Sequence, residues 1–457
     1  MGLLHQHQEG NTVLNIILLS GGSGKRLWPL SNEVRSKQFL KIFKKVDGSH
    51  ESMVQRMYRM IQEVDKDAAV TIATSENQVT SIRSQLGDSV GISIEPCRRD
   101  TFPAIALATA YLHDRQGIDA NETVVVCPVD PYVESDYFQM LEKLSNQASK
   151  GEANLVLMGV EPTYPSEKYG YIIPESKDQI ASVETFKEKP DVATAENYIA
   201  AGALWNGGVF AYKLSYVLNI AEKIFGTADY QWLFDNYSTL TKISFDYAVV
   251  EKEEKIQVMR FAGQWKDLGT WNTLTEAMSD EVAGNAVAVD CSNTHVINEL
   301  QIPLIALGGQ NLAIAATPDG ILVIDKKRSD KLKDYVADQR PMVEKRGWGE
   351  YQVLDYRIKA DGQNFLTKHL IITPGQHISY QRHQHRSEIW TFVDGTGKLI
   401  LNGEVKPVTR GEMAYIKPGT KHAIKADTEL HIIEVQVGDE LTEEDIERFD
   451  WDWDSVD

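Results

Sequence analysis

From Val13 to about Thr275, apolar and polar residues alternate in a way that predicts strands and helices in turn. Short runs rich in β-branched residues predict buried strands, which are Asn15–Leu19, Val70–Ala73, Gly91–Ile94, Thr123–Cys127 and Leu155–Val160. Apolar residues at helical spacing predict helices between them, at Asn77–Leu86, Pro103–Tyr111 and Tyr137–Ala148. Strands that alternate with helices form βαβ units, so we expect an α/β domain with a mostly parallel sheet. Ligands of such sheets bind at the carboxyl ends of the strands.

The pattern changes after about Gly284. From there to Lys326, short β segments are separated by turn residues such as Asn285 and Pro303, which predicts a small β connector. The charged stretch Lys326–Lys345 predicts a helix or a linker.

Strand-like alternation returns beyond Gly347, for example in Leu366–Ile372 and Ile389–Val393, and predicts an all-β carboxyl-terminal domain. Thr442 and Asp445 have the spacing of a helix cap and predict one last short helix. We therefore expect three parts, at residues 12–280, 281–340 and 341–457.

Composition and charge narrow the class of protein. Hydrophobic residues make up 42% and charged residues 25% of the 457, an ordinary globular mix. The net charge of −19 would repel nucleic acid, so we expect no such partner. The longest apolar stretches, Val13–Leu19 and Pro103–Leu112, are too short to span a membrane, and no secretory signal is expected. Cys97, Cys127 and Cys291 lie far apart and form no disulfide framework, which favours a cytoplasmic protein.

A glycine-rich loop follows the first predicted strand. Gly21, Gly22 and Gly24 leave backbone N–H groups open to a phosphate, because no Cβ obstructs them. Leu19 stands where a Walker A loop has its first glycine, and Leu27 stands where a dinucleotide loop has its third. Neither of these two common phosphate loops is therefore present.

Two cations after the loop are candidates to offset phosphate charge. Arg26 could bind a polyphosphate bidentately, and Lys37 could place a point charge on the α-phosphate. The segment resembles the G-G-x-G-x-R-L-x-P-L signature of sugar-phosphate nucleotidyltransferases. Trp28 and the Gln38–Leu40 triplet are similar to the mannose-1-phosphate guanylyltransferase branch. Ser36 stands where the family usually has proline. The resemblance implies a Rossmann-like fold and GTP as a substrate.

The segment Glu95–Ala104 resembles the E-P-x-x-R-(N/D)-T-x-P-A lining of the family's nucleoside pocket. Taken alone, it could equally be an ordinary capped helix start. The resemblance implies the nucleotide-binding residues, which are Leu19, Ser20, Gly21, Gly22, Gly24, Glu95, Arg99, Asp100 and Thr101.

Two aspartates are candidate Mg²⁺ ligands. Asp130 ends a buried strand, where an α/β enzyme would hold the metal, although Pro131 follows it where the family has histidine. Asp267 lies in Trp265–Trp271, which resembles the family's W-x-D-(V/L)-G-(S/T)-W box. One Mg²⁺ between them would offset their like charge.

Four further segments resemble the sugar side of the family's site. They are Lys168–Ile172 (Y-G-Y-I), Phe186–Pro190 (F-x-E-K-P), Leu204–Gly208 (W-N-(S/G)-G) and Ser244–Ala248 (S-x-D-(Y/x)-A). The resemblance implies that the sugar phosphate is bound by Gly170, Glu188, Lys189, Asn206 and Asp246, with Lys189 on its phosphate. In the last segment, a helix N-cap role for Ser or Asp is equally open.

The chemistry that follows is an in-line transfer. A sugar 1-phosphate oxygen attacks the nucleotide α-phosphorus and pyrophosphate leaves. The nucleophile is already an anion, so no general base is needed. Arg26, Lys37, Asp130 and Asp267 are the expected catalytic residues, with Lys189 and Mg²⁺ helping to offset charge.

The segment Gly375–Trp390, followed by Val393–Thr396, resembles the first motif of a cupin, a double-stranded β-helix, and Pro418–His422 resembles the second. The resemblance implies a ligand set for Zn²⁺ or another divalent metal, namely Gln381, His383, Glu388 and His422. Strand alternation would put His385 on the same face, either behind the metal ligands or as a substrate-side group. A metal-free cupin that serves as a dimer interface or scaffold remains open.

The same stretch resembles the phosphomannose isomerase domain that follows the guanylyltransferase in bifunctional proteins, and so does Arg346–Tyr351. Arg386 would then bind the phosphate of an open-chain sugar phosphate. Ile389 replaces the family's histidine and Lys417 its proline, which leaves isomerisation open.

The leading expectation is an enzyme that makes GDP-mannose from GTP and mannose 1-phosphate for polysaccharide biosynthesis, as a homo-oligomer such as a dimer. Ser36, Pro131 and Gly207 leave room for another sugar 1-phosphate or another base. A regulatory sugar-nucleotide-binding protein with an inactive site is a further alternative, as is a protein whose cupin alone is the enzyme. The intact set Arg26, Lys37, Asp130 and Asp267 argues against a pure binder.

Overall fold

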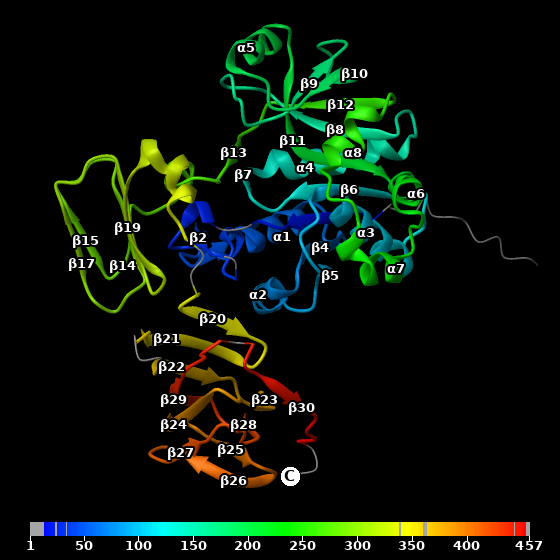
Figure 1. The fold of residues 1–457 in the computed structure, drawn as a ribbon. Helices are drawn as coiled ribbons and strands as arrows, with labels where there is room; N and C mark the ends of the chain where they lie inside the picture. The colour runs from blue at the N-terminus through cyan, green and yellow to red at the C-terminus, as the bar shows by residue number, and fades with distance from the viewer. Residues whose placement is uncertain are drawn as a thin grey trace, which may run out of the picture. The chain divides into compact units, whose positions relative to one another are not determined.

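The computed structural model describes residues 13–22, 25–32, 34–337, 340–359, 363–442 and 444–453 (Figure 1). The chain forms two compact units. One unit takes in the described residues up to Leu27, then Arg35–Glu281 and Lys326–Leu332. The other takes in Trp28–Val34, Val282–Asp325 and the described residues from Lys333 onward.

The first unit is built on a nine-stranded sheet. In spatial order the strands are β5 (Gly91–Glu95), β4 (Ala69–Ser75), β1 (Asn15–Ser20), β6 (Thr123–Pro128), β11 (Leu204–Lys213), β8 (Leu155–Val160), β12 (Ile256–Phe261), β10 (Ile180–Lys187) and β9 (Tyr171–Pro174). The pairs among β5, β4, β1 and β6 are parallel, as the βαβ pattern predicted, and β8 with β12 is parallel too. β11, β10 and β9 pair antiparallel. These additions make the Rossmann-like sheet a mixed one.

The helices of this unit are α1 (Met53–Val64), α2 (Glu76–Leu86), α3 (Thr101–Asp114), α4 (Ser135–Ser149), α5 (Val192–Ala200), α6 (Leu214–Phe225), α7 (Tyr230–Asp235), α8 (Phe245–Ala248) and α9 (Trp271–Ala277). The predicted strands are confirmed as β1, β4, β5, β6 and β8, and the predicted helices as α2, α3 and α4. α3 is apolar nearly all round and lies in the main core, which explains the long apolar run in its sequence.

Shorter elements complete this unit. A hairpin joins β2 (Lys41–Lys44) to β3 (His50–Ser52), and β7 (Pro131–Val133) pairs with β13 (Trp265–Asp267). Short 3-10 turns lie at Lys25–Leu27, Lys37–Phe39, Tyr237–Thr239 and Val250–Lys252.

Short strands occupy the predicted β connector, which lies in the second unit. Its strands are β14 (Val282–Gly284), β15 (Ala286–Val289), β16 (His295–Asn298), β17 (Leu304–Leu307), β18 (Leu312–Thr317) and β19 (Gly320–Asp325). β14, β16 and β18 pair in parallel, β15 pairs in parallel with β17, and β18 turns back into β19. The charged stretch that follows begins with a 3-10 helix, Lys326–Asp334.

The rest of the second unit is the predicted all-β domain, with two sheets and a main core to which both contribute. The first sheet, in spatial order, is β20 (Val343–Arg346), β21 (Gly349–Arg357), β22 (Asn364–Ile372), β29 (Leu430–Gly438), β24 (Arg386–Asp394) and β27 (Met413–Ile416). The second is β26 (Glu404–Thr409), β25 (Thr396–Leu401), β28 (His422–Ala426), β23 (His377–Arg382) and β30 (Glu447–Phe449).

The predicted last helix at Thr442–Asp445 is wrong, because none of the described residues after Leu441 is helical. The Asp445 carboxylate accepts hydrogen bonds from the backbone N–H groups of Gln384 and His385 instead of capping a helix. Long-range partners have overridden the local capping signal. Within the described residues, no helix is long and apolar enough to cross a membrane.

Candidate active sites

The loop residue Ser36 is tied to the glycine loop by a buried polar network. Its hydroxyl donates to the Gly22 carbonyl oxygen (3.3 Å) and accepts from the Gln78 amide (2.8 Å). The Gln38 amide donates to the Ser20 hydroxyl (2.9 Å) and to Gln78 Oε1 (3.2 Å). Ser36 thus replaces the family's proline with hydrogen bonds that fix the segment before Lys37. Gln78 was not predicted, because a glutamine on a surface-type helix gives no signal in the sequence.

Lys37 lies between the two predicted metal-binding aspartates. Its Nζ is 2.6 Å from Asp130 Oδ2 and 3.7 Å from Asp267 Oδ1. The register of β7 on β13 places Asp267 opposite Pro131, next to Asp130 in sequence. Burial alone would lower the pKa of Lys37, but the two carboxylates outweigh it and raise the pKa. The lysine is therefore a cation throughout the physiological range.

Arg26 is exposed at the end of the glycine loop and near enough to Lys37 for its charge to oppose the protonated lysine. The carboxylates of Asp130 and Asp267 are 38% and 37% exposed, so both can still take a ligand. A Cβ at Gly269 would lie 3.0 Å from Asp267 Oδ1, so the glycine leaves that carboxylate room. Two hard oxygen ligands beside the glycine loop fit a magnesium ion.

The sugar-side segments converge on one cavity of about 260 Å³. Its lining contains, among others, Asp130, Gly170, Glu188, Asn206, Asp246 and Asp267. The Asn206 amide donates to Asp246 Oδ1 (2.7 Å), which joins two of the predicted residues directly. The structure thus brings lining residues that are 18 (Gly170 to Glu188) to 137 (Asp130 to Asp267) positions apart in sequence to one place beside Lys37.

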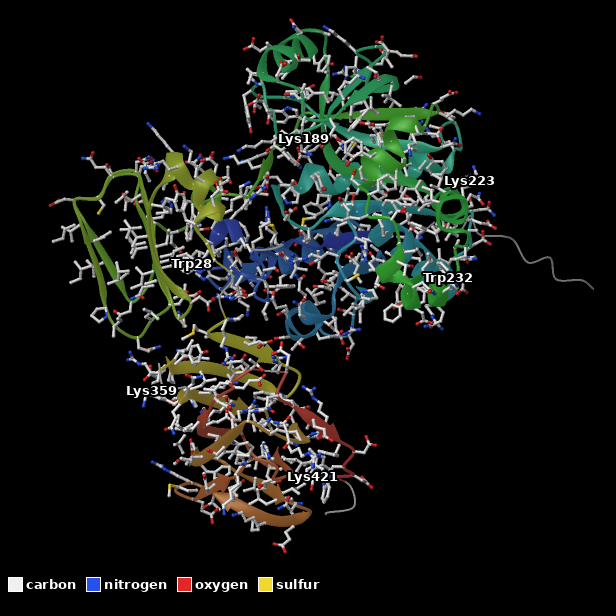
Figure 2. All side chains as sticks on the ribbon, in the orientation of Figure 1. Trp28, Lys189, Lys223, Trp232, Lys359 and Lys421 are labelled. Atoms are coloured by element: carbon white, nitrogen blue, oxygen red, sulfur yellow. The ribbon has the colours of Figure 1, made fainter. Side chains whose placement is uncertain are left out.

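Gly170 is needed where β9 begins. A Cβ there would lie 2.5 Å from Glu188 Oε2 and 2.7 Å from the Phe186 ring, so any side chain would displace the carboxylate. Lys189 pairs with Glu188, and its side chain is 59% exposed. Lys189 is labelled in Figure 2. Tyr169, Trp205 and Trp265 form an aromatic wall, with ring centroids 5.0 to 6.5 Å apart.

The predicted nucleoside residues are grouped around Glu95 and the start of α3. Tyr237 donates to Glu95 Oε2 (2.9 Å), and burial raises the pKa of the Glu95 carboxyl. A Cβ at Gly21 would lie 3.9 Å from Glu95 Oε1, so this oxygen faces the glycine loop. The Nε of Arg99 is buried and has no hydrogen-bond partner among the described residues. Tyr237 was missed, because nothing in its local sequence marks it.

The helix start itself is strongly fixed. Asp100 has a left-handed φ of 71° and caps α3 by accepting from the Thr101 N–H. Thr101 Oγ1 in turn accepts from the Phe245 N–H (2.8 Å), which joins the predicted nucleoside segment to α8, whose Asp246 lines the cavity described above. Leu19 and Ser20 end β1 beside this group, whereas predicted Gly24 lies outside the described residues.

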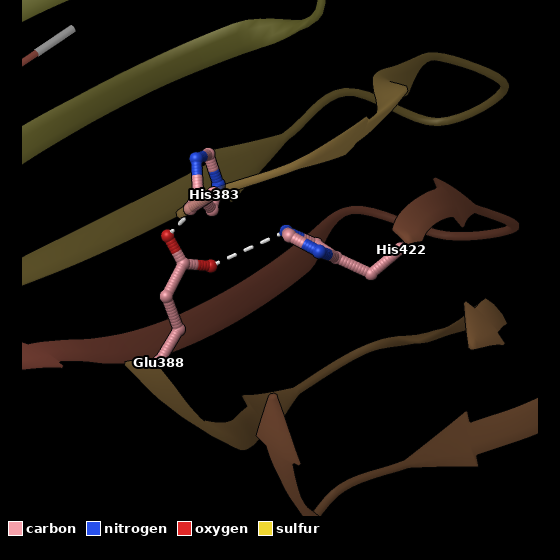
Figure 3. A group of neighbouring side chains, drawn as sticks. All are labelled: His383, Glu388 and His422. Atoms are coloured by element: carbon pink, nitrogen blue, oxygen red, sulfur yellow. Dashed lines mark ion pairs between the residues drawn. The ribbon is translucent and has the colours of Figure 1, made fainter. Parts of the chain in front are cut away.

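The all-β domain holds a buried cluster of His383, Glu388 and His422 (Figure 3). Glu388 Oε1 is 3.2 Å from His383 Nε2, and Glu388 Oε2 is 3.4 Å from His422 Nε2. Burial alone would raise the pKa of Glu388, but His422, His383 and Arg386 outweigh it and hold the pKa well below its usual range. Burial lowers the pKa of His383, whereas Glu388 raises that of His422 against its burial.

Backbone carbonyls orient both rings of the cluster. His383 Nδ1 lies 2.5 Å from the Asp445 carbonyl oxygen, and His422 Nδ1 lies 3.0 Å from that of Thr420. These contacts direct the Nε2 atoms toward Glu388. Glu388 Oε2 and His422 Nε2 are buried and pair with each other only at ion-pair distance (3.4 Å), with no hydrogen bond to either atom in the described part of the chain. Two histidines, a carboxylate and unsatisfied buried atoms fit a divalent metal.

Gln381 belongs to this cluster but His385 does not. Gln381 Nε2 is 3.4 Å from His383 Nε2. The prediction that His385 shares their face is wrong, because β23 ends at Arg382 and the alternation stops there. The His385 ring is 51% exposed and lies near Asp439 and Glu440.

Arg386 is buried rather than open to a ligand. Its Nε donates to Glu388 Oε1 (3.0 Å), and its Nη1 donates to the Thr442 carbonyl oxygen (2.9 Å). Its Nη2 is 3.2 Å from His383 Nε2. The expected contact with a substrate phosphate would require these bonds to open. In the described arrangement, Arg386 balances the charge of Glu388.

Comparison with known proteins identifies relatives along nearly the whole chain. Residues 15–283 match the nucleotidyl transferase family, and residues 336–451 match the mannose-6-phosphate isomerase C-terminal family. The xanthan biosynthesis protein XanB of Xanthomonas campestris pv. campestris strain B100 is 33% identical, over 95% of this chain and 97% of XanB. The mannose-1-phosphate guanylyltransferase of Salmonella montevideo is 30% identical, over 95% of this chain and 98% of its own.

One solved structure extends the likeness to three dimensions. It is a Thermus thermophilus protein described as mannose-1-phosphate geranyltransferase, with a TM-score of 0.60 and 28% identity. The match covers 71% of this chain and 98% of that one. Domains of both matched families generally use divalent metals.

Proposed function

The chain belongs to the nucleotidyl transferase family and carries a mannose-6-phosphate isomerase C-terminal domain, and from this we propose that it makes GDP-mannose from GTP and mannose 1-phosphate. The family membership confirms the resemblance inferred from the motifs. The observation that carries the proposal is the meeting of Lys37, Asp130 and Asp267 at the rim of the sugar cavity. The full-length likeness to relatives named for guanylyl transfer supports the choice of substrates.

The proposed reaction joins two anions. GTP lies with its phosphates on the glycine loop and its base toward Glu95 and Arg99, and the sugar phosphate occupies the cavity with its phosphate near Lys189. The 1-phosphate oxygen attacks the α-phosphorus, the bond to the bridging oxygen breaks, and pyrophosphate leaves. Arg26 and Lys37 balance charge on the transferred phosphoryl group. Asp130 and Asp267 would hold Mg²⁺, which supplies further positive charge when it is bound.

A second activity is proposed for the all-β domain, interconversion of mannose 6-phosphate and fructose 6-phosphate. The buried His383, Glu388 and His422 cluster with its unsatisfied atoms favours it over a purely structural cupin. Gln381 and these three residues would hold Zn²⁺ or another divalent metal. Ile389 stands where the family has a histidine, and its side chain neither donates nor accepts a proton.

Both activities can be tested with assays on the full chain. Pyrophosphate release is measured for GTP, ATP, UTP and CTP against mannose, glucose and other sugar 1-phosphates. We expect the highest kcat/KM for GTP with mannose 1-phosphate, and preference for another pair would contradict the assignment. Fructose 6-phosphate formation from mannose 6-phosphate is measured on the same protein, and its absence with Zn²⁺, Mg²⁺ and Co²⁺ would refute the second activity.

Asp246 gives the sugar cavity a pH-sensitive group. Burial, followed by the nearby Glu188 carboxylate, raises the pKa of Asp246 to about 6, although the Asn206 hydrogen bond lowers it. Above this value the group is a carboxylate that accepts from sugar hydroxyls, and below it the group is neutral. We expect the KM for the sugar 1-phosphate to rise by up to about tenfold per pH unit below this pKa.

The matched variant for this prediction is Asp246→Asn, because the phosphate of the substrate itself titrates near pH 6. In this variant the substrate phosphate still titrates, but position 246 no longer carries a titratable carboxyl group. The ratio of KM values in variant and parent should therefore change with pH. A constant ratio across pH 5 to 8 would show that Asp246 does not titrate against the sugar.

A further inference from the structure

The segment Trp28–Val34 joins Arg26 to Lys37 in sequence, yet it packs in the second unit with the β connector. Trp28, Pro29 and Asn32 all contact the turn between β18 and β19, which is Thr317–Gly320. Figure 2 labels Trp28 beside the connector strands. The segment between two proposed phosphate-binding cations is thus held by a part of the chain that follows the catalytic domain.

Hydrogen bonds from the connector fix the segment's backbone and side chains. Thr317 Oγ1 donates to the Pro29 carbonyl oxygen (3.1 Å), in a buried position. The Asn32 amide donates to Asp319 Oδ2 (2.7 Å), while Asn32 Oδ1 accepts from the Val34 N–H (2.9 Å). The second Asp319 oxygen, Oδ1, accepts from the Met342 N–H (2.7 Å). Asp319 thus joins the segment to the chain that leads into the all-β domain.

Close packing adds a second restraint. A Cβ at Gly320 would overlap Trp28 Cζ2, a rigid ring atom that cannot turn aside as a flexible chain end would. The indole is therefore seated directly on the backbone of the connector turn. Only glycine permits this approach.

We propose that the connector turn Thr317–Gly320 positions Arg26 and Lys37 for nucleotidyl transfer, with Asp319 and Asn32 as positioning residues. The inference rests on the proposed function of the Lys37 site. A loop that holds two cations against phosphates works better if it is already ordered before substrate binds. The loss of conformational entropy then occurs on folding and does not add to the activation free energy. Ser36 and Gln78 fix the residues just before Lys37, and the connector turn holds Pro29 within Trp28–Val34.

The hydrogen-bond pattern permits an exchange test in the full chain. Asn32→Asp places two carboxylates face to face and loses the bond, so we expect kcat for pyrophosphate release to fall by about tenfold or more. The double variant Asn32→Asp with Asp319→Asn restores the pattern with donor and acceptor exchanged. The new amide at position 319 donates to the new carboxylate at 32, and its oxygen still accepts from Met342. We expect kcat to return to within about twofold of the parent.

A second readout separates positioning from general damage. Hydrogen–deuterium exchange of the peptide that covers Trp28–Val34 should speed up in Asn32→Asp and return to the parent rate in the double variant. The thermal unfolding midpoint is recorded for all three proteins. Gly320→Ala, which pushes on Trp28, should also lower kcat, whereas Gly347→Ala, whose Cβ would meet nothing within 4 Å, should not.

Each result bears on a separate statement. A parent chain with no nucleotidyl transfer would overturn the proposed function. An active parent whose kcat is unchanged in Asn32→Asp would overturn this inference alone. If Asn32→Asp lowers kcat and the double variant does not restore it, the inference is also overturned, because the Asn32–Asp319 hydrogen bond would then not be the means of positioning.

Discussion

Lys37→Ala is expected to lower kcat for GDP-mannose formation by about 10³-fold, the effect of losing one preorganised charge at a transition state. Lys37 Nζ is the cation that bridges Asp130 and Asp267, so the variant also removes the side-chain charge that balances these two carboxylates. We expect kcat to fall more than the KM for GTP changes, because the charge on the α-phosphoryl group is greatest during transfer. Steady-state pyrophosphate release measures both constants.

The control for this variant is Lys41→Ala, which removes an exposed lysine four residues along the same chain segment. It should retain the parent's kcat. Lys37→Arg should recover only part of the activity, because a guanidinium fork does not fit a position shaped for a point charge between two carboxylates. A Lys37→Ala protein that turns over at the parent's rate would remove Lys37 from the mechanism.

Glu388→Gln is expected to abolish metal retention and isomerisation in the all-β domain. Glu388 is 1% exposed, and its two oxygens face His383 and His422. The amide removes the carboxylate of the three-residue cluster and leaves the buried Arg386 paired with the more distant Asp445 carboxylate (3.6 Å). Metal content after dialysis against Zn²⁺, read by mass spectrometry, and fructose 6-phosphate formation are the two measurements.

Glu404→Gln is the matched control, since it makes the same change at an exposed position in β26 of the same domain. It should retain bound metal and isomerisation. Tight Zn²⁺ binding by Glu388→Gln would show that this carboxylate is not a ligand. If the parent itself binds no divalent metal, the cluster is a structural ion pair and the isomerase proposal fails.

Much of the transferase fold follows from local pattern. Strands β1, β6 and β8 are buried on both faces and appear as short apolar runs, while α2 and α4 carry apolar residues at helical spacing. The connector was also predicted from local pattern, because each of its short strands ends in a turn that favours residues such as Asn, Gly and Pro. The antiparallel strands on the sugar side were not predicted as sheet partners, because pairing direction depends on contacts between distant segments.

Candidate site residues were predicted where they lie in short contiguous sequence motifs. Asp130, Gly170, Glu188, Asn206 and Asp267 each lie in such a motif, and the structure places them around one cavity. Residues that hold other site residues in place were missed. Gln78, Tyr237 and Asp319 are polar residues that belong to no recognisable sequence motif. His385 was misplaced because strand alternation was extended past the end of β23.

The seating of Trp28 on the connector also limits how the protein can be divided. A shortened chain that ends near Glu281 would keep every transferase motif but would leave the Trp28 indole and the Pro29 carbonyl without their seat. A cut beyond the 3-10 helix Lys326–Asp334 keeps that seat. When isomerase domains are swapped between such enzymes, the connector should therefore stay with the transferase domain, although the transferase motifs end before it.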